Sequence, residues 1–133
     1  MKIIDVEGIG TTYADKLKAA GIDTTEQFLT SAGTQKGRQT LEDSTGISAK
    51  LLLEWANHVD LMRVDGVGSE FSDLLEAAGV DSCPELAQRN ATSLIAKMTE
   101  INEVKSLTRR LPTEAQVAGW IKQAGDLPKI VTH

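Results

Sequence analysis

Two glycine pairs, each enclosing one residue, are the clearest candidates for chemistry in this 133-residue chain. The first is Gly8-Ile9-Gly10 and the second is Gly66-Val67-Gly68. A glycine pair lets the backbone turn sharply, and a helix that starts after it points free N–H groups outward at the positive end of its dipole. Each turn is therefore a candidate site for a phosphate or another anion.

The residues that follow each pair separate the two turns. Thr11 and Thr12 follow the first pair, whereas Ser69 and Glu70 follow the second, where a glutamate would face the phosphate. Net charge is −1 over Asp5 to Gly21 and −3 over Arg63 to Gly79. Non-specific DNA affinity comes almost wholly from contacts between cations and phosphates, so the second turn should repel DNA. The candidate anion-binding set is Gly8, Ile9, Gly10, Thr11, Thr12, Lys16 and Lys18. We interpret Gly66, Val67 and Gly68 as a structural turn, and turn geometry alone would also explain the first pair, an explanation we favour over phosphate contact.

Basic residues gather at two other places. Lys36 and Arg38 form one short cluster, and Lys105, Arg109 and Arg110 form a candidate basic patch. Lys105 and Arg109 are four residues apart in a stretch expected to be helical, so we expect them to share one helix face. Solvated surface is the favoured interpretation, and a site for an anion or an acidic partner is the alternative.

No arrangement of residues typical of an enzyme is present. The glycine pairs lack the third glycine of a dinucleotide fingerprint and the lysine of a phosphate-binding loop, and no serine lies in a nucleophile elbow. One cysteine, Cys83, excludes an internal disulfide, and His58 and His133 are too few for a zinc cluster. A thiolate at Cys83 near a helix start is conceivable, but a small buried residue is favoured. We therefore expect no catalysis, no metal and no cofactor.

The elements that position these residues belong to an internal duplication. Residues 6–29 and 64–87 share nine identities in 24 ungapped positions. In each copy apolar residues at helical spacing follow the glycine pair, and Gly21 or Gly79 then ends the helix in a Schellman motif. A capping box, Thr24-x-x-Gln27 or Ser82-x-x-Glu85, starts the next helix.

The rest of each half also shows a common pattern. Trp55 and Trp120 lie in later apolar runs, where we expect them to fill the core. The offset between the halves grows from 58 to about 65, which places an insertion in the stretch expected to be helical from Ser93 to Arg110. We predict an all-α chain of roughly eight to ten short helices. The repeat units would be residues 1–62 and 63–133, with an irregular tail from Pro128, packed as one domain or two.

Several segments resemble a widespread bacterial family of unknown function that is made of tandem helix-hairpin-helix motifs. These segments are Lys36–Arg38, Glu54–His58, Glu76–Val80, Glu85–Asn90 and Arg109–Pro112, together with both glycine turns. The resemblance implies SAM-domain-like bundles of short, orthogonally packed helices. It also implies that DNA-binding relatives carry a basic residue after the second glycine, which this chain lacks, and that some hairpins hold a monovalent cation on turn carbonyls.

Composition bounds the function. The chain has 14 basic and 19 acidic residues, a net charge of −5 that does not favour DNA or an anionic membrane. No apolar run reaches the roughly 20 residues needed to cross a bilayer, and no signal peptide precedes the first turn, so we expect a cytoplasmic protein. The favoured hypothesis is a non-catalytic protein-interaction adaptor. The alternative is sequence-independent binding of DNA or RNA phosphates by the first hairpin. Both a monomer and a homo-oligomer remain open.

Overall fold

The computed structural model describes all 133 residues. Its regular elements are all helices, and one isolated bridge pairs Lys2 with Thr24. The 3₁₀ helix and the eight α-helices are η1 (Ile3–Asp5), α1 (Thr11–Ala19), α2 (Thr25–Ala32), α3 (Gln35–Thr45), α4 (Ala49–Leu61), α5 (Ser69–Ala77), α6 (Cys83–Ala87), α7 (Ala91–Lys105) and α8 (Glu114–Asp126). The expectation of an all-α chain with eight to ten short helices is confirmed. None of these helices has the length and apolar character that crossing a membrane requires.

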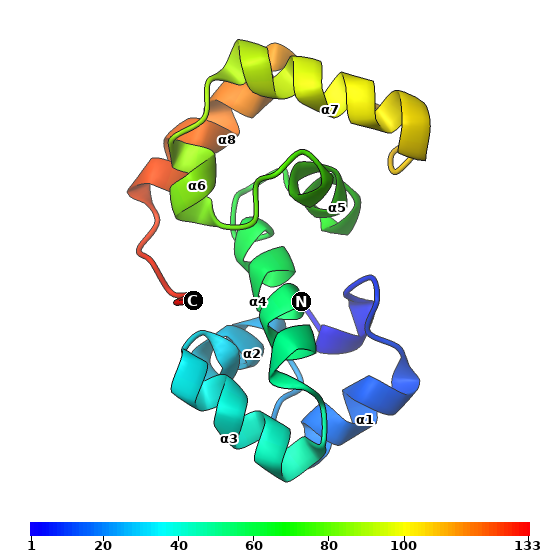
Figure 1. Cartoon of the computed structure of the whole chain (residues 1–133), viewed down its shortest axis with the longest axis vertical. Coiled ribbons are helices and arrows are strands. Elements are labelled where there is room, and N and C mark those ends of the chain that lie inside the picture. The colour runs from blue at the N-terminus through cyan, green and yellow to red at the C-terminus, as the bar shows by residue number, and fades with distance from the viewer. The chain divides into compact units, whose positions relative to one another are not determined.

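The chain divides into two compact units. The first contains Met1–Val59 and Ile130–His133, and the second contains Asp60–Lys129. The first unit takes in α1 to α3 and most of α4, and the second contains α5 to α8 (Figure 1). The division thus falls inside α4 and not after residue 62, and the last four residues pack with the first unit rather than with the second. The physical reason is that the Val131 side chain completes the first core and is only 2% exposed.

The two units end their first helix in the same way. The Gly21 N–H donates to the Lys18 carbonyl and the Ile22 N–H donates to the Leu17 carbonyl, each at 2.9 Å. Both bonds recur around Gly79 in the second unit. This is the hydrogen-bond pair of a Schellman motif, with its apolar contact buried in each core, so the predicted helix ends are confirmed.

The second helix of each unit starts at a capping residue. In the first unit the box is complete, because Thr24 accepts from the Gln27 N–H and Gln27 accepts from the Thr24 N–H. In the second unit Ser82 accepts from the Glu85 N–H at 3.4 Å, but the Glu85 carboxylate pairs with Arg89. The second box is therefore only half formed, and the helix it starts, α6, has five residues.

One tryptophan anchors each core, as the sequence predicted. Trp55 is 6% exposed and meets the ring of Tyr13 edge-on, with centroids 5.0 Å apart. Trp120 is 3% exposed and lies 5.3 Å from the ring of Phe71. Tyr13 and Phe71 occupy equivalent places in the duplication, so both copies join their first and last helices through an aromatic pair.

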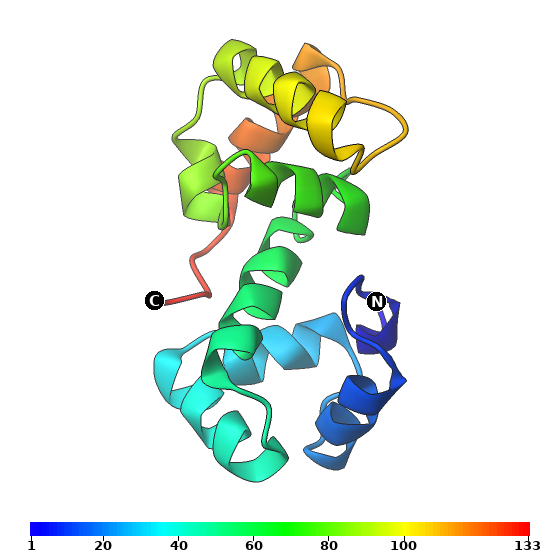
Figure 2. The same ribbon diagram turned by 45° about the vertical axis from the view of Figure 1, so that its right-hand side comes forward.

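The third helices pack differently in the two units. In the second unit α7 packs against both α5 and α8 (Figure 2). In the first unit the main partner of α3 is α2. Buried Leu94 and Met98 belong to α7, whereas Arg38 and Leu41 are the buried residues of α3. Less apolar surface is therefore available on α3 to close the first unit.

Candidate binding site in the first unit

The first glycine turn has the geometry expected for a helix start that is open to an anion. Gly8 has a φ of +91°, Ile9 is buried, and Gly10 is the N-cap of α1 without a capping side chain. Gly10, Thr11 and Thr12 are exposed. The free N–H groups of the first turn of α1 are thus accessible.

The two lysines assigned to this turn lie elsewhere. Lys16 and Lys18 are in the last turn of α1, and both are exposed. Seven residues of helix separate Thr11 from Lys18, or about 10 Å along the axis. The structure therefore brings Gly10, Thr11 and Thr12 together at one end of α1 and leaves the lysines toward the other end.

The second glycine turn repeats the backbone of the first with a different surface. Gly66 has a φ of +93°, Val67 is buried, and Gly68 is the N-cap of α5. Glu70 lies exposed in the first turn of α5. An acidic side chain at the positive end of a helix stabilises the helix and competes with any external anion.

The prediction that Lys105 and Arg109 of the basic patch share one helix face is wrong. α7 ends at Lys105, and Ser106 follows in the left-handed conformation with a φ of +51°. The side chain of Asn102 then holds the main chain of Thr108 by two hydrogen bonds, at 3.0 and 3.1 Å. Arg109 therefore lies outside the helix, because a side-chain amide has replaced the helical bonds that would carry α7 further. Lys105, Arg109 and Arg110 are all exposed.

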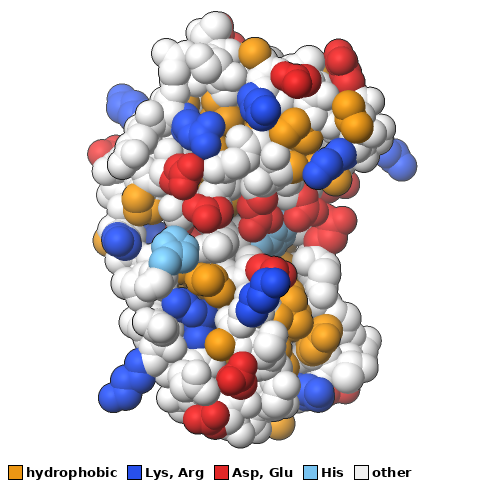
Figure 3. Space-filling model, in the orientation of Figure 1, with side chains coloured by type: hydrophobic (Ala, Val, Ile, Leu, Met, Phe, Trp, Pro, Cys, Tyr) orange, Lys and Arg blue, Asp and Glu red, His pale blue; other side chains and the backbone are white.

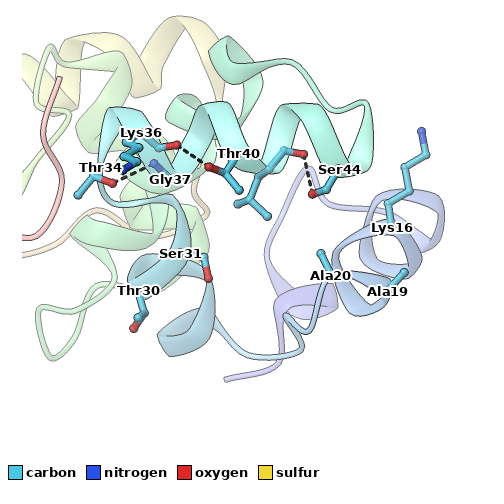
Figure 4. A pocket seen from close by; sticks show the side chains of 11 residues that line it. Lys16, Ala19, Ala20, Thr30, Ser31, Thr34, Lys36, Gly37, Thr40 and Ser44 are labelled. Atoms are coloured by element: carbon cyan, nitrogen blue, oxygen red, sulfur yellow. Dashed lines mark hydrogen bonds between the residues drawn. The ribbon is translucent and has the colours of Figure 1, made fainter.

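A cavity of about 660 Å³ opens between α1, α2 and α3 (Figure 4). We call it the first-unit cavity. Its cationic lining residues are Lys16 and Lys36, and no acidic residue lines it. Its hydroxyl-bearing lining residues are Thr30, Ser31, Thr34, Thr40 and Ser44. Ala19, Ala20, Gly37 and Leu41 complete the wall. The volume lies within the range of roughly 300–1,000 Å³ that is typical of ligand sites.

The hydroxyl groups of the cavity are oriented by their own helices. Thr30, Thr40 and Ser44 each donate to a main-chain carbonyl of the same helix, at 3.0, 3.1 and 3.3 Å. Thr34, the N-cap of α3, accepts from the Gly37 N–H at 3.0 Å. A hydroxyl that donates its proton still has lone pairs, so the first three can accept from a ligand and Thr34 can donate.

The floor of the first-unit cavity depends on a close approach between α2 and α3. A Cβ atom at Gly37 would lie 1.9 Å from the Ser31 carbonyl oxygen. Only a glycine allows this contact, because a backbone oxygen cannot move aside as a side chain would. Gly37 therefore sets the distance between the two helices that form the cavity.

Arg38 is a buried structural residue and not part of a surface cluster with Lys36. It is 3% exposed, and its guanidinium donates to the carbonyls of Ala32, Gly33 and Thr132. Burial lowers its pKa. The first two carbonyls lie at the C-terminal end of α2, so the cation stabilises the negative end of that helix and also holds the C-terminal tail.

Cys83 is likewise committed to structure. Its side chain is fully buried, its thiol donates to the Asp60 carbonyl at 3.1 Å, and burial, followed by the Asp60 charge, raises its pKa to about 12. The Asp60 carboxylate accepts from the Cys83 N–H and from Arg63. The thiol therefore stays protonated at neutral pH, which supports a space-filling role.

The first-unit cavity was not found by the sequence reasoning, although one signal pointed to it. Lys36, Thr40 and Ser44 are spaced by four residues, which places them on one face of α3. A polar face at this spacing is usual for a solvated helix. What the sequence did not reveal is that this face meets Lys16 and the end of α1.

Helical secondary structure, two duplicated units and a lysine-bearing cavity in the first unit define an all-α protein with a candidate site for an anionic group. Residues 7–127 match the family described as a domain of unknown function (DUF4332). Because this match covers most of the chain, the protein belongs to that family. No curated protein and no solved structure matches the chain.

Proposed function

We propose that this protein is a non-catalytic binding module that works as a protein-interaction adaptor in the cytoplasm. The observation that carries the proposal is the first-unit cavity, where two lysines and no acidic residue line a concave surface of a chain with net charge −5. A local reversal of charge of this kind favours an anionic group on the partner. The commitment of Cys83 to a structural contact supports a role without chemistry.

We also infer that the two units are helix-hairpin-helix repeats of the SAM-like kind. The support is the order of elements that both copies share: a glycine turn, a helix with a Schellman end, and a second helix started by a capping residue. The resemblance noted in the sequence points the same way. In such a protein the repeat supplies a scaffold, and the surface of each copy decides what it binds.

A second candidate function is sequence-independent binding of DNA or RNA phosphates by the first hairpin. The observation in its favour is the uncapped start of α1, where Gly10, Thr11 and Thr12 are exposed. Against it stands the charge distribution, because basic and acidic side chains are intermixed on the face of the first unit shown in Figure 3. A nucleic-acid site is usually a basic patch or stripe.

One experiment separates the two functions. The protein is titrated against a labelled acidic peptide and a labelled DNA duplex, with binding followed by fluorescence anisotropy over a salt series. The adaptor proposal expects peptide binding that the Lys16→Gln and Lys36→Gln double variant weakens, with Lys18→Gln as the matched control. Lys18 lies on the same helix but does not line the cavity. Tight DNA binding that is lost with a steep salt slope and that ignores the double variant would refute the adaptor.

A further inference from the structure

The first-unit cavity marks a place where the two copies depart from their common plan. The position of Lys16 in the first copy is taken by Leu74 in the second. Leu74 is fully buried in one core cluster with Leu94 and Met98 of α7. Apolar side chains thus close the second copy at the place where the first copy keeps an exposed lysine and open space.

A lysine residue lies at each end of the first-unit cavity. Lys36 lies in the first turn of α3, beside Thr34, and Lys16 lies on α1 at the end where Ser44 is found (Figure 4). Eight residues of α3 separate Lys36 from Ser44, which is about 12 Å along the helix axis. Lys16 lies beyond Ser44, on α1 (Figure 4), so an occupant with negative charge at two points at least that far apart would match both lysines.

The cavity wall between the two lysines can accept hydrogen bonds from a ligand that carries donor groups. Thr30, Thr40 and Ser44 donate their own protons to main-chain carbonyls, so they offer lone pairs to the cavity. Ala19 and Leu41 add apolar surface. A polypeptide main chain supplies N–H donors between its side chains, which a run of phosphates does not.

We propose that the first-unit cavity seats an extended acidic segment of a partner protein. Two carboxylates of the segment pair with Lys16 and Lys36, and its main-chain N–H groups face the hydroxyl oxygens of the wall. An extended chain rises about 3.3 Å per residue, so the two acidic residues are at least about four residues apart. This proposal rests on the adaptor function and names the chemistry of its partner.

A nucleic-acid strand fits the same surface less well. Its phosphates follow one another at about 3.4 Å along the duplex axis, so three or four would face a stretch of about 12 Å. Only two lysines line the cavity to meet them. Charge complementarity therefore favours a peptide with two separated acids over a continuous row of phosphates.

The test uses the full chain and a set of labelled glycine- and serine-rich peptides, each carrying two glutamates. The glutamates are adjacent, four residues apart or eight residues apart. We expect the peptides with spacings of four and eight to bind better than the peptide with adjacent glutamates, and Lys16→Gln or Lys36→Gln to weaken their binding by about two- to fivefold each, as expected for a partly exposed ion pair. Lys18→Gln should leave the affinity unchanged. Amide shifts of Gly37 and Ser44 in heteronuclear NMR locate the peptide.

Each other outcome has a defined meaning. If all three spacings bind equally and still require both lysines, the extended arrangement is overturned and the adaptor function stands. If peptide binding ignores both lysines, or if no peptide binds, both proposals fall. If a DNA duplex or a small dicarboxylate displaces the peptide and shifts the same amides at lower concentration, the segment is not the occupant. Both lysines are exposed, so circular dichroism should show folded variants.

Discussion

Replacement of Arg38 by methionine should destabilise the first unit by about 2–4 kcal/mol. Methionine fills similar space but removes the donors to the carbonyls of Ala32, Gly33 and Thr132. A buried acceptor without a partner lowers the free energy of unfolding by about 1–3 kcal/mol. The full penalty applies to the Ala32 carbonyl, because Ala32 is completely buried. The Gly33 carbonyl still accepts a hydrogen bond from the Thr132 N–H, at 2.8 Å. Loss of its bond to Arg38 should therefore cost closer to 1 kcal/mol, the usual net contribution of one hydrogen bond to stability.

The assay is urea unfolding followed by tryptophan fluorescence. A Trp120→Phe background leaves Trp55 as the only reporter, so the signal follows the core of the first unit. Lys36→Met is the matched control, because Lys36 is exposed and on the same helix. Arg38→Lys should be more stable than Arg38→Met but less stable than the unchanged protein, since an ammonium lacks the planar set of N–H donors of a guanidinium. A change below about 0.5 kcal/mol for Arg38→Met would refute the reasoning, because it would mean that these carbonyls find water in the folded state.

Three further predictions concern other parts of the chain. The Cys83 thiol should resist alkylation at pH 8 until urea is added. Because its pKa is raised from 9.0 to about 12, its contribution to the free energy of unfolding should be complete below pH 9 and should fall as pH rises from 9 toward 12. In a pH series of unfolding curves, Cys83→Ala should remove this slope. Leu74→Lys should lower the free energy of unfolding, measured by chemical denaturation, by more than about 3 kcal/mol, because Leu74 is fully buried. Lys16→Leu, at the equivalent exposed position, should change it by less than about 0.5 kcal/mol. Gly66→Ala should lower the melting temperature, because its φ is +93° and a Cβ would lie 3.0 Å from an indole nitrogen, whereas Gly119→Ala inside α8 should raise it.

Local signals predicted much of the fold. Gly21 and Thr24 end and start helices where the sequence places them, because the hydrogen bonds involved span only a few residues. The end of α7 was not predicted, because the hydrogen bonds that hold the chain after it span more residues than a helix cap does. Asn102 reaches six residues ahead to Thr108, and no helix-stop pattern announces such a bond.

The candidate site could be predicted less well than the fold. Lys16 and Lys18 were assigned to the glycine turn because they are close in sequence, but a helix carries them away from it. Lys36 and Arg38 are two residues apart on α3, so they face different directions, and only Arg38 is buried. Which side of a helix is covered depends on contacts between distant segments, and sequence spacing alone does not contain them.

The return of residues 130–133 to the first unit bears on the order of events during synthesis. The core of the first unit lacks Val131 until the 70 residues from Asp60 to Lys129 have been translated. At about 5–20 residues per second this delay is roughly 4–14 s. Domains usually complete their folding from the N-terminus onward, but here the last core residue of the first unit is made after the whole of the second unit. A chain truncated after Lys129 should therefore keep a folded second unit and a less stable first one.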